Sequence, residues 1–332
     1  MKLDKGKIIN SWPFVIAILG ILAISKIENQ YYLGMIFNTL LWVAIAGSWQ
    51  IVGGYAGEFS LGHAAFFGIG AYTSTLLYIH FSVSPWIGMF IGAAFAGIIG
   101  FLLSWTCFRL RGHFFTLATL AFGQVVLIIA TSWRSLTSGS EGLLLPIKMG
   151  FWQMSFESKH AYVYLVLIYA ISVILFTYVM ERRRLGYYLI AYRENDEAAR
   201  SLGVNTFRAR LTASTISAFF TAIGGTIYAQ YTFFIEPESV LPVTLSIQAP
   251  LVSIVGGLGT PFGPLFGAVL ILPLSQFLRG IFGSSFNGLH LIIYGLILIV
   301  VLLLMPSGLG PVILKGWRKI TGAQVKKINA SG

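Results

Sequence analysis

The chain has 332 residues, of which 56% are hydrophobic and only 10% are charged, and its mean hydropathy is +0.81. A soluble domain carries about a quarter of its residues as charged side chains, and one core of this size could not bury so much apolar surface. The net charge of +11 lies in short segments between apolar runs, so it indicates membrane topology and not a nucleic-acid partner. The composition therefore predicts an all-α, polytopic integral membrane protein surrounded by lipid.

Apolar runs long enough to cross a bilayer follow one another along the chain. About 20 helical residues span about 30 Å of hydrocarbon. About ten transmembrane helices are predicted, at 12–27, 33–53, 59–80, 85–107, 113–133, 160–181, 211–233, 243–258, 263–283 and 288–306. The third and ninth runs open on Gly-rich stretches, which predicts broken or re-entrant helix there. The two long loops, 134–159 and 182–210, each have fewer than 30 residues, so residues 1–332 are expected to form a single transmembrane domain.

The first predicted span has features of a secretory signal peptide. A basic start, Met1 to Lys7, precedes an apolar run, and Ala23-Ile24-Ser25 forms a passable cleavage site. We interpret the run as a retained first helix, because the rest of the chain inserts into the membrane in any case. Cleavage remains the alternative.

Basic residues follow the positive-inside rule if the N-terminus is cytoplasmic. Ten spans then return the C-terminus to the cytoplasm, and most of the 22 Lys and Arg residues fall on that side. An Arg forced to the centre of a span costs about 3 kcal/mol, so Arg182, Arg183 and Arg184 are expected to hold the 182–210 loop in the cytoplasm. Both termini and this loop are therefore predicted to be cytoplasmic, with 134–159 and 235–242 outside.

The chain lacks the sequence signatures of ATP hydrolysis and of metal chemistry. No G-x-x-x-x-G-K-[ST] phosphate loop occurs, and no H-E-x-x-H or Cys/His cluster suggests a metal. No Asp lies in a predicted span, and Glu58 is the one carboxylate near membrane depth apart from boundary residues such as Glu181. Proton coupling normally needs such groups, whereas sodium sites built from backbone carbonyls stay open. We expect no catalytic residue, no metal and no cofactor.

The 182–210 loop carries the signals of a short capped helix. Either Asn195 or Asp196 can cap its first N–H groups, and Glu197 then lies favourably near the positive end of the helix dipole. Gly203 can end the helix in a left-handed conformation. A short helix outside the bilayer is suited to docking on another protein, and a solvated connector is the alternative.

Four stretches of the sequence together resemble a known family. The E-A-A-x-x-x-G pattern of Glu197, Ala198, Ala199 and Gly203 resembles the coupling segment of ABC importer permeases. The other stretches are Gly54–Tyr72, Leu110–Gly123 and Val255–Ala268. With them, the chain from about residue 35 to about residue 310 resembles the LivM-type permease of branched-chain amino acid ABC transporters. Glu58 departs from the Gln expected in that family, which concerns fine substrate specificity and not family membership.

The resemblance implies a multi-subunit importer in a bacterial-type cell (inner) membrane. Its expected partners are a second permease subunit, two ATP-binding subunits and an extracytoplasmic substrate-binding protein. ATP hydrolysis would then reside on the separate ATPase subunits, and 182–210 would be the cytoplasmic coupling loop. Substrates in the family are leucine, isoleucine and valine, with relatives that take other amino acids, urea or short amides. Substrate choice in such systems rests largely with the binding protein.

Neutral polar side chains are the candidates for the translocation pathway, because moving an uncompensated ion through hydrocarbon is costly. They suit a small neutral or zwitterionic solute. The helix ends at the two Gly-rich stretches, 53–70 and 256–267, could meet the charges of such a solute. Only Glu58 is placed to act as a fixed counter-charge for an ionic solute. The candidates are Ser60, His63, Thr116, Thr119, Gln124, Ser214, Ser217 and Gln248. Structural packing is the alternative for His63 and for the hydroxyl stripe that Ser214 and Ser217 form with Thr221.

Two functions of other classes stay open on the sequence. One is an ATP-independent channel or secondary transporter for a small polar solute such as urea. The other is a membrane-embedded enzyme, which would need converging carboxylates, metal ligands or an activated nucleophile. An ATPase that co-purifies with the chain would separate the importer from both.

Overall fold

The computed structural model describes residues 26–108 and 112–282, together with isolated positions between 292 and 310. The predicted first span, 12–27, lies almost entirely outside the described residues, and the last span, 288–306, is described only at isolated positions. The long helices are α2 (Gln30–Gln50), which continues into a π-helical turn (Ile51–Tyr55), α3 (His63–Phe81), α4 (Pro85–Cys107), α5 (His113–Ser132), α7 (Lys159–Glu181), α10 (Thr206–Thr232), α12 (Val243–Gly256) and α13 (Gly263–Phe282).

Shorter elements connect these helices. They are α6 (Arg134–Thr137), a 3-10 turn (Gly139–Glu141), β1 (Leu143–Leu144), α8 (Arg184–Glu194), α9 (Asp196–Ser201), β2 (Phe234–Ile235) and α11 (Pro237–Val240). The two strands pair antiparallel, with Leu143 opposite Ile235. This pairing joins the two loops that the sequence predicts to face outside.

Eight helical segments within the described residues are long and apolar enough to cross a membrane. They coincide with the second to the ninth predicted runs, with α2 and its π-helical turn acting as one segment, Gln30–Tyr55, and α11 with α12 as another, Pro237–Gly256. The all-α, multi-pass class is therefore confirmed. The count of about ten stays a prediction, because the first run lies almost wholly outside the described residues and the last is described only at isolated positions.

Local signals explain where several helices begin. The Asn29 side chain accepts a hydrogen bond from the Tyr31 N–H at 2.9 Å and caps α2. Ser158 does the same for the His160 N–H at 3.2 Å and caps α7. Pro85 starts α4 at a position where its missing N–H costs nothing. These short-range contacts satisfy N–H groups that have no partner inside the helix.

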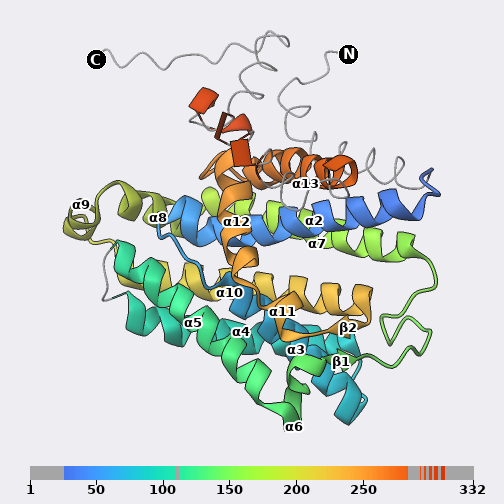
Figure 1. The fold of residues 1–332 in the computed structure, drawn as a ribbon. Coiled ribbons are helices and arrows are strands. Elements are labelled where there is room, and N and C mark those ends of the chain that lie inside the picture. Colours follow the sequence, from blue (N-terminus) through green and yellow to red (C-terminus); the bar gives the residue numbers. More distant parts are fainter. Residues whose placement is uncertain are drawn as a thin grey trace, which may run out of the picture.

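Helix α10 occupies the middle of the bundle and packs against α2, α3 and α4 (Figure 1). Helix α2 in turn packs against α7 and α13. Glycines allow the closest of these approaches, since a Cβ at Gly225 would stand 1.9 Å from the Phe67 carbonyl oxygen and one at Gly70 2.1 Å from that of Ala222. Close backbone packing of this kind is the usual means by which membrane helices associate.

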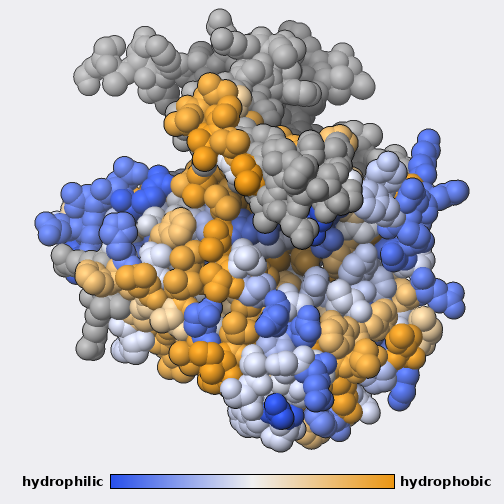
Figure 2. Space-filling model, in the orientation of Figure 1, coloured by the Kyte–Doolittle hydropathy of each residue, from blue (hydrophilic) through white to orange (hydrophobic). Residues whose placement is uncertain are grey.

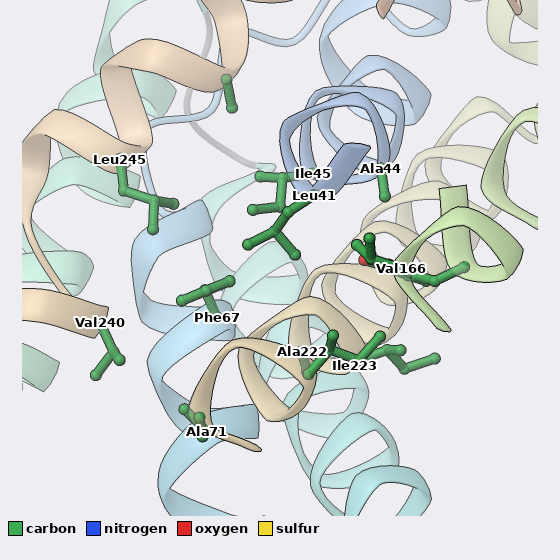
Figure 3. Packing of buried hydrophobic residues seen from close by; sticks show 14 of the residues in the cluster. Leu41, Ala44, Ile45, Phe67, Ala71, Val166, Ala222, Ile223, Val240 and Leu245 are labelled. Atoms are coloured by element: carbon green, nitrogen blue, oxygen red, sulfur yellow. The ribbon is translucent and has the colours of Figure 1, made fainter. Parts of the chain in front are cut away.

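The hydrophobic core lies between α2, α3, α7 and α10. Figure 3 shows Ile45 of α2, Phe67 of α3 and Ile223 of α10 among its side chains, with Val166 of α7 beside them. All four are buried. The core thus joins residues from helices that are far apart in the sequence and fixes the positions of the loops between them.

Many apolar side chains face outward, in contrast to a soluble protein. On α5 alone, Phe114, Leu117, Val125 and Ile128 are all exposed. Figure 2 shows hydrophilic residues gathered at the end that carries α8 and α9 and at the opposite end, with apolar surface between them. This distribution fits a protein whose flanks contact lipid or other apolar subunits.

Candidate functional site

The 182–210 loop folds into two short helices, α8 and α9, at one end of the bundle (Figure 1). Asn195 caps α9 by accepting a hydrogen bond from the Ala198 N–H at 3.0 Å. Gly203 has φ +83°, its N–H bonds to the Arg200 carbonyl at 2.9 Å, and the Val204 N–H bonds to the Ala199 carbonyl at 3.0 Å. These two bonds form a Schellman C-cap, so both ends of the predicted helix are as expected, with Asn195 as the cap.

Four residues of the α9 region were predicted to contact the ATPase, and not all of them are exposed. Glu197, Ala198 and Gly203 are exposed, whereas Ala199 is buried, with 3% of its surface accessible. Ala199 therefore holds the helix against the rest of the molecule, because its methyl group faces inward. Leu202, which the sequence analysis did not single out, is 85% exposed. The exposed surface of α9 thus includes Glu197 and Ala198, together with Arg200 and Ser201, and the exposed Leu202 and Gly203 follow directly after the helix.

A buried ion pair attaches the loop to the first Gly-rich stretch. The Arg210 guanidinium, at the start of α10, forms a salt bridge with Glu58, and the Tyr192 hydroxyl of α8 donates to the same Glu58 carboxylate at 2.5 Å. The guanidinium also lies over the rings of Phe108, at 4.0 Å, and Tyr192, at 4.6 Å. Burial, together with the hydrogen bond to Glu58 and its charge, raises the pKa of Tyr192 above its usual value.

This geometry changes the expected role of Glu58. The sequence placed it as the available counter-charge for an ionic solute, but its charge is met by Arg210 within the protein. Two charges taken out of water are tolerated when they pair closely and keep further hydrogen bonds. Glu58 is therefore part of a structural junction between the 56–62 segment, α8 and α10.

The two Gly-rich stretches meet beside this junction. Each contains residues outside regular helix with positive φ, Gly57 in the first and Gly257 and Gly259 in the second. The Gln50 side-chain amide donates to the Thr260 carbonyl, and Arg193 of α8 donates from Nη1 to the Gly54 carbonyl at 2.8 Å. The residues that precede the third and ninth predicted runs thus lie against each other, and Gly54 also lies against the loop.

Two candidate pathway residues tie α5 to the 56–62 segment, and a third lies in that segment and joins it to α2. The Thr116 hydroxyl donates to the Phe59 carbonyl at 2.7 Å, and Thr119 Oγ1 accepts from the Leu61 N–H at 3.0 Å. Ser60 is buried, and its carbonyl accepts from Trp49 Nε1 at 2.8 Å. These bonds bring together the stretches Gly54–Tyr72 and Leu110–Gly123, of which the structure describes all but 110 and 111.

The candidates on α3 and α10 make contacts between helices. His63 Nε2 lies 2.8 Å from the Ser217 hydroxyl, which donates to the Ser48 carbonyl at 2.6 Å. The Ser214 and Ser104 hydroxyls are 2.5 Å apart. All five side chains are buried. The packing alternative therefore has direct support for His63, Ser214 and Ser217.

Gln124 on α5 and Gln248 on α12 are the remaining pathway candidates. Both are half-buried, and neither side-chain amide has a hydrogen bond within the described residues. The two helices are in contact. Their amides are the candidate groups that stay available to a solute.

Sequence reasoning assigned Arg193 and Arg210 to membrane topology alone. Glu58 is the feature of the sequence that could have indicated a buried ion pair, because a carboxylate near membrane depth requires a cationic partner. Which cation fills that role depends on how the loop folds back on the bundle. Nothing local in the sequence distinguishes Arg210 from the other arginines of the loop.

These observations define an all-α, multi-pass membrane protein whose loop, predicted to be cytoplasmic, is attached by polar contacts to the first of two broken segments, which lie against each other. Residues 31–302 match the family model described as branched-chain amino acid transport system / permease component, and the chain belongs to this family.

Curated relatives agree with this family assignment. The chain is 28% identical over 326 residues to the high-affinity branched-chain amino acid transport system permease protein LivM of Escherichia coli (strain K12), which covers 91% of this chain and 72% of that protein. It is 29% identical to LivM of Salmonella typhimurium, over 82% of this chain and 68% of that protein. LivH of Escherichia coli (strain K12) is 25% identical, over 84% and 95% respectively. No solved structure matches the chain significantly.

Proposed function

We propose that the chain is the transmembrane permease subunit of an ATP-driven importer for branched-chain or related small amino acids. The observation that carries this proposal is the family match over residues 31–302. It is supported by LivM and LivH relatives that align over most of the chain. The protein has no ATP-hydrolysing role of its own in this proposal, and a separate subunit supplies that energy.

The ATPase subunit docks on the exposed face of α9. Glu197, Ala198 and Leu202 form the contact surface, while the caps at Asn195 and Gly203 hold the helix in shape. Ala199 contributes from the inside, by anchoring the helix. The 182–210 loop and both termini are then cytoplasmic, in a bacterial-type inner membrane, as the distribution of basic residues predicts.

The complete importer contains a second permease subunit, two ATP-binding subunits and an extracytoplasmic binding protein. The apolar flank of α5 is a candidate for contact with lipid or with the second permease. The outer end of the pathway lies beside β1 and β2, opposite α9 (Figure 1). The binding protein delivers substrate there.

The solute is small and neutral or zwitterionic. Within the described residues, the ionic groups beside the broken segments include Glu58, Arg210 and Arg193, with Glu181 next to Tyr55. Glu58 and Arg210 neutralise each other. The amides of Gln124 and Gln248 and the backbone dipoles of the Gly-rich stretches are the groups that meet the solute. The hydroxyls of Ser60, Thr116, Thr119, Ser214 and Ser217, and His63, shape and support the path.

ATP binding drives transport by shifting a conformational equilibrium. The ATPase pair binds one permease state better than the other, and such differential affinity is the only way in which a ligand can bias an equilibrium. Movement of α9 then transmits the conformational change of the ATPase pair to the permease.

Uptake assays test the proposal. Cells with and without the gene are compared for uptake of labelled leucine, isoleucine and valine, and the purified chain is examined for a co-purifying ATPase. We expect a deficit in branched-chain uptake and a bound ATPase. Normal uptake of these amino acids with a collapse of lysine or glutamate uptake would contradict the solute class. Transport of a solute such as urea without any ATPase would instead indicate a channel or secondary transporter.

A further inference from the structure

Arg193 occupies the last turn of α8, two residues before the cap of α9. Its Nη1 atom donates to the Gly54 carbonyl at 2.8 Å, and its Nη2 atom forms an ion pair with Glu194 at 3.0 Å. Gly54 lies among the last residues of the segment Gln30–Tyr55, whose carbonyls have no partner inside the helix. A guanidinium at this end both satisfies a free carbonyl and meets the negative end of the helix dipole.

Missing side chains make room for this arginine in both Gly-rich stretches. A Cβ at Gly57 would stand 2.8 Å from Arg193 Cγ, and one at Gly259 would stand 2.9 Å from Arg193 Nη1. Both glycines also have positive φ, +73° and +69°, a region that β-carbons disfavour. Arg193 therefore lies in a recess that glycines on two different stretches create.

The two stretches are also in direct contact with each other. A Cβ at Gly54 would stand 3.0 Å from the Gly259 backbone nitrogen, and the Gln50 amide donates to the Thr260 carbonyl. Gly54 closes the segment that begins with α2, and Gly259 lies between α12 and α13. A side chain that is hydrogen-bonded to Gly54 and packed beside Gly259 can move the ends of three spans together.

We propose that Arg193 is a positioning residue that transmits displacement of α9 to the two Gly-rich stretches, and so couples the docking helix to the opening of the pathway. This inference rests on the proposed function. The connection is short, because Arg193 and the α9 cap Asn195 are two residues apart. It is also directional, because a charge-assisted hydrogen bond from a guanidinium is strong and geometrically specific. The exposed face of α9 needs no part of Arg193, so docking and transmission are separable.

The experiment uses the full importer, with its ATPase subunits and binding protein, reconstituted in lipid. Arg193→Gln removes the positive charge and shortens the side chain, whereas Arg193→Lys keeps the charge but lacks the planar guanidinium. Arg184→Gln, at the other end of α8, is the matched control. Three quantities are measured, namely ATPase co-purification, ATP hydrolysis rate, and leucine imported per ATP hydrolysed. We expect Arg193→Gln to retain the first two and to lose at least about tenfold in the third, since a hydrogen bond to a charged group is worth more than one tenfold step.

A labelling measurement reports the transmitted movement itself. Thr260→Cys is introduced after Cys107→Ala, and its rate of thiol labelling is compared with and without ATP. We expect the rate to depend on ATP in the otherwise unchanged chain and with Arg184→Gln, and to lose that dependence with Arg193→Gln. Arg193→Lys should give intermediate values in both assays.

Several results would overturn the inference while leaving the importer function standing. Unchanged import per ATP in Arg193→Gln would show that the contact transmits nothing. Loss of ATPase binding in that variant would make Arg193 a docking residue. If both Arg193 variants failed to insert while Arg184→Gln inserted, Arg193 would be a folding residue. A wild-type chain that neither bound an ATPase nor imported amino acids would instead contradict the proposed function.

Discussion

Glu58 and Arg210, 152 positions apart in the sequence, form an ion pair whose side chains are only 9% and 6% exposed. The pair connects the first Gly-rich stretch, through Glu58, to the start of α10, through Arg210. Tyr192 of α8 adds a hydrogen bond to the same Glu58 carboxylate. Breaking a buried pair by removing one partner leaves an uncompensated charge in a site of low polarity. This pair should therefore control the stability of the end of the bundle that carries α9.

Removal of one partner of the pair should be more damaging than removal of both. Arg210→Met is expected to lower the free energy of unfolding by about 3–5 kcal/mol, and the double change with Glu58→Leu to recover most of that loss. Thermal unfolding in detergent can be followed with a thiol-reactive dye, because Cys107 is the only cysteine and is buried. Glu194→Gln, which alters an exposed pair, should cost at most about 1 kcal/mol. If the double variant loses as much stability as Arg210→Met alone, or more, then the unpaired Glu58 carboxylate is not the cause of the loss.

Tyr192 should make the protein sensitive to alkali. Burial and the Glu58 carboxylate raise the pKa of Tyr192 in the folded state, so its neutral form is favoured there. The stabilisation is fully present below the unfolded pKa of about 10 and is lost as the pH rises beyond it. In unfolding curves measured between pH 8 and pH 12, a range of about two units on either side of that value, Tyr192→Phe should lose less stability with pH than the wild type. Parallel curves for the two proteins would contradict this assignment.

The exposed face of α9 should bind the ATPase without contributing to folding. Leu202→Asp and Glu197→Lys are expected to leave insertion and thermal stability unchanged and to abolish ATPase co-purification, because both side chains are exposed. Leu144→Asp is the matched control, since Leu144 is 77% exposed at the opposite end of the bundle. Gly203→Ala should cost about 1 kcal/mol through its positive φ alone, since nothing lies within 4 Å of an added Cβ. Normal co-purification with both charged variants would favour the connector interpretation of the loop.

The proposed topology can be tested by labelling from outside the cell. Ser201→Cys and Ser140→Cys, each introduced after Cys107→Ala, place thiols at exposed positions of the two loops. An impermeant reagent applied to intact cells should label the variant at position 140 and spare the variant at position 201. Permeabilised cells should give labelling of both. The reverse pattern in intact cells would invert the orientation.

The close contact of α3 with α10 should tolerate no added methyl group. Gly225→Ala would place a Cβ 1.9 Å from the Phe67 carbonyl oxygen, so the helices must separate and the yield of folded protein should fall sharply. Gly280→Ala, where nothing lies within 4 Å, should stabilise α13 by up to about 1 kcal/mol through helix propensity. Detergent-extracted yield and melting temperature check both. Wild-type behaviour of Gly225→Ala would show that the packing is looser than the structure indicates.

Much of the architecture was predictable because its causes are local in the sequence. A span needs only a run of apolar residues of sufficient length, and eight of the predicted runs recur as helices within the described part of the chain. The caps at Asn195 and Gly203 depend on neighbours within four residues. Membrane class, the approximate positions of eight spans and the short loop helix therefore followed from the amino-acid sequence, whereas several helix boundaries differ by up to six residues.

The tertiary structure alone decided which polar groups meet. It paired Glu58 with Arg210, set Arg193 against Gly54 and Gly259, and turned Ala199 inward. It also placed Ser214 and Ser217 in bonds between helices and left Gln124 and Gln248 without partners among the described residues. Local pattern cannot select among several arginines in one loop, because the energy of each contact depends on burial and on partners brought together only when the helices pack.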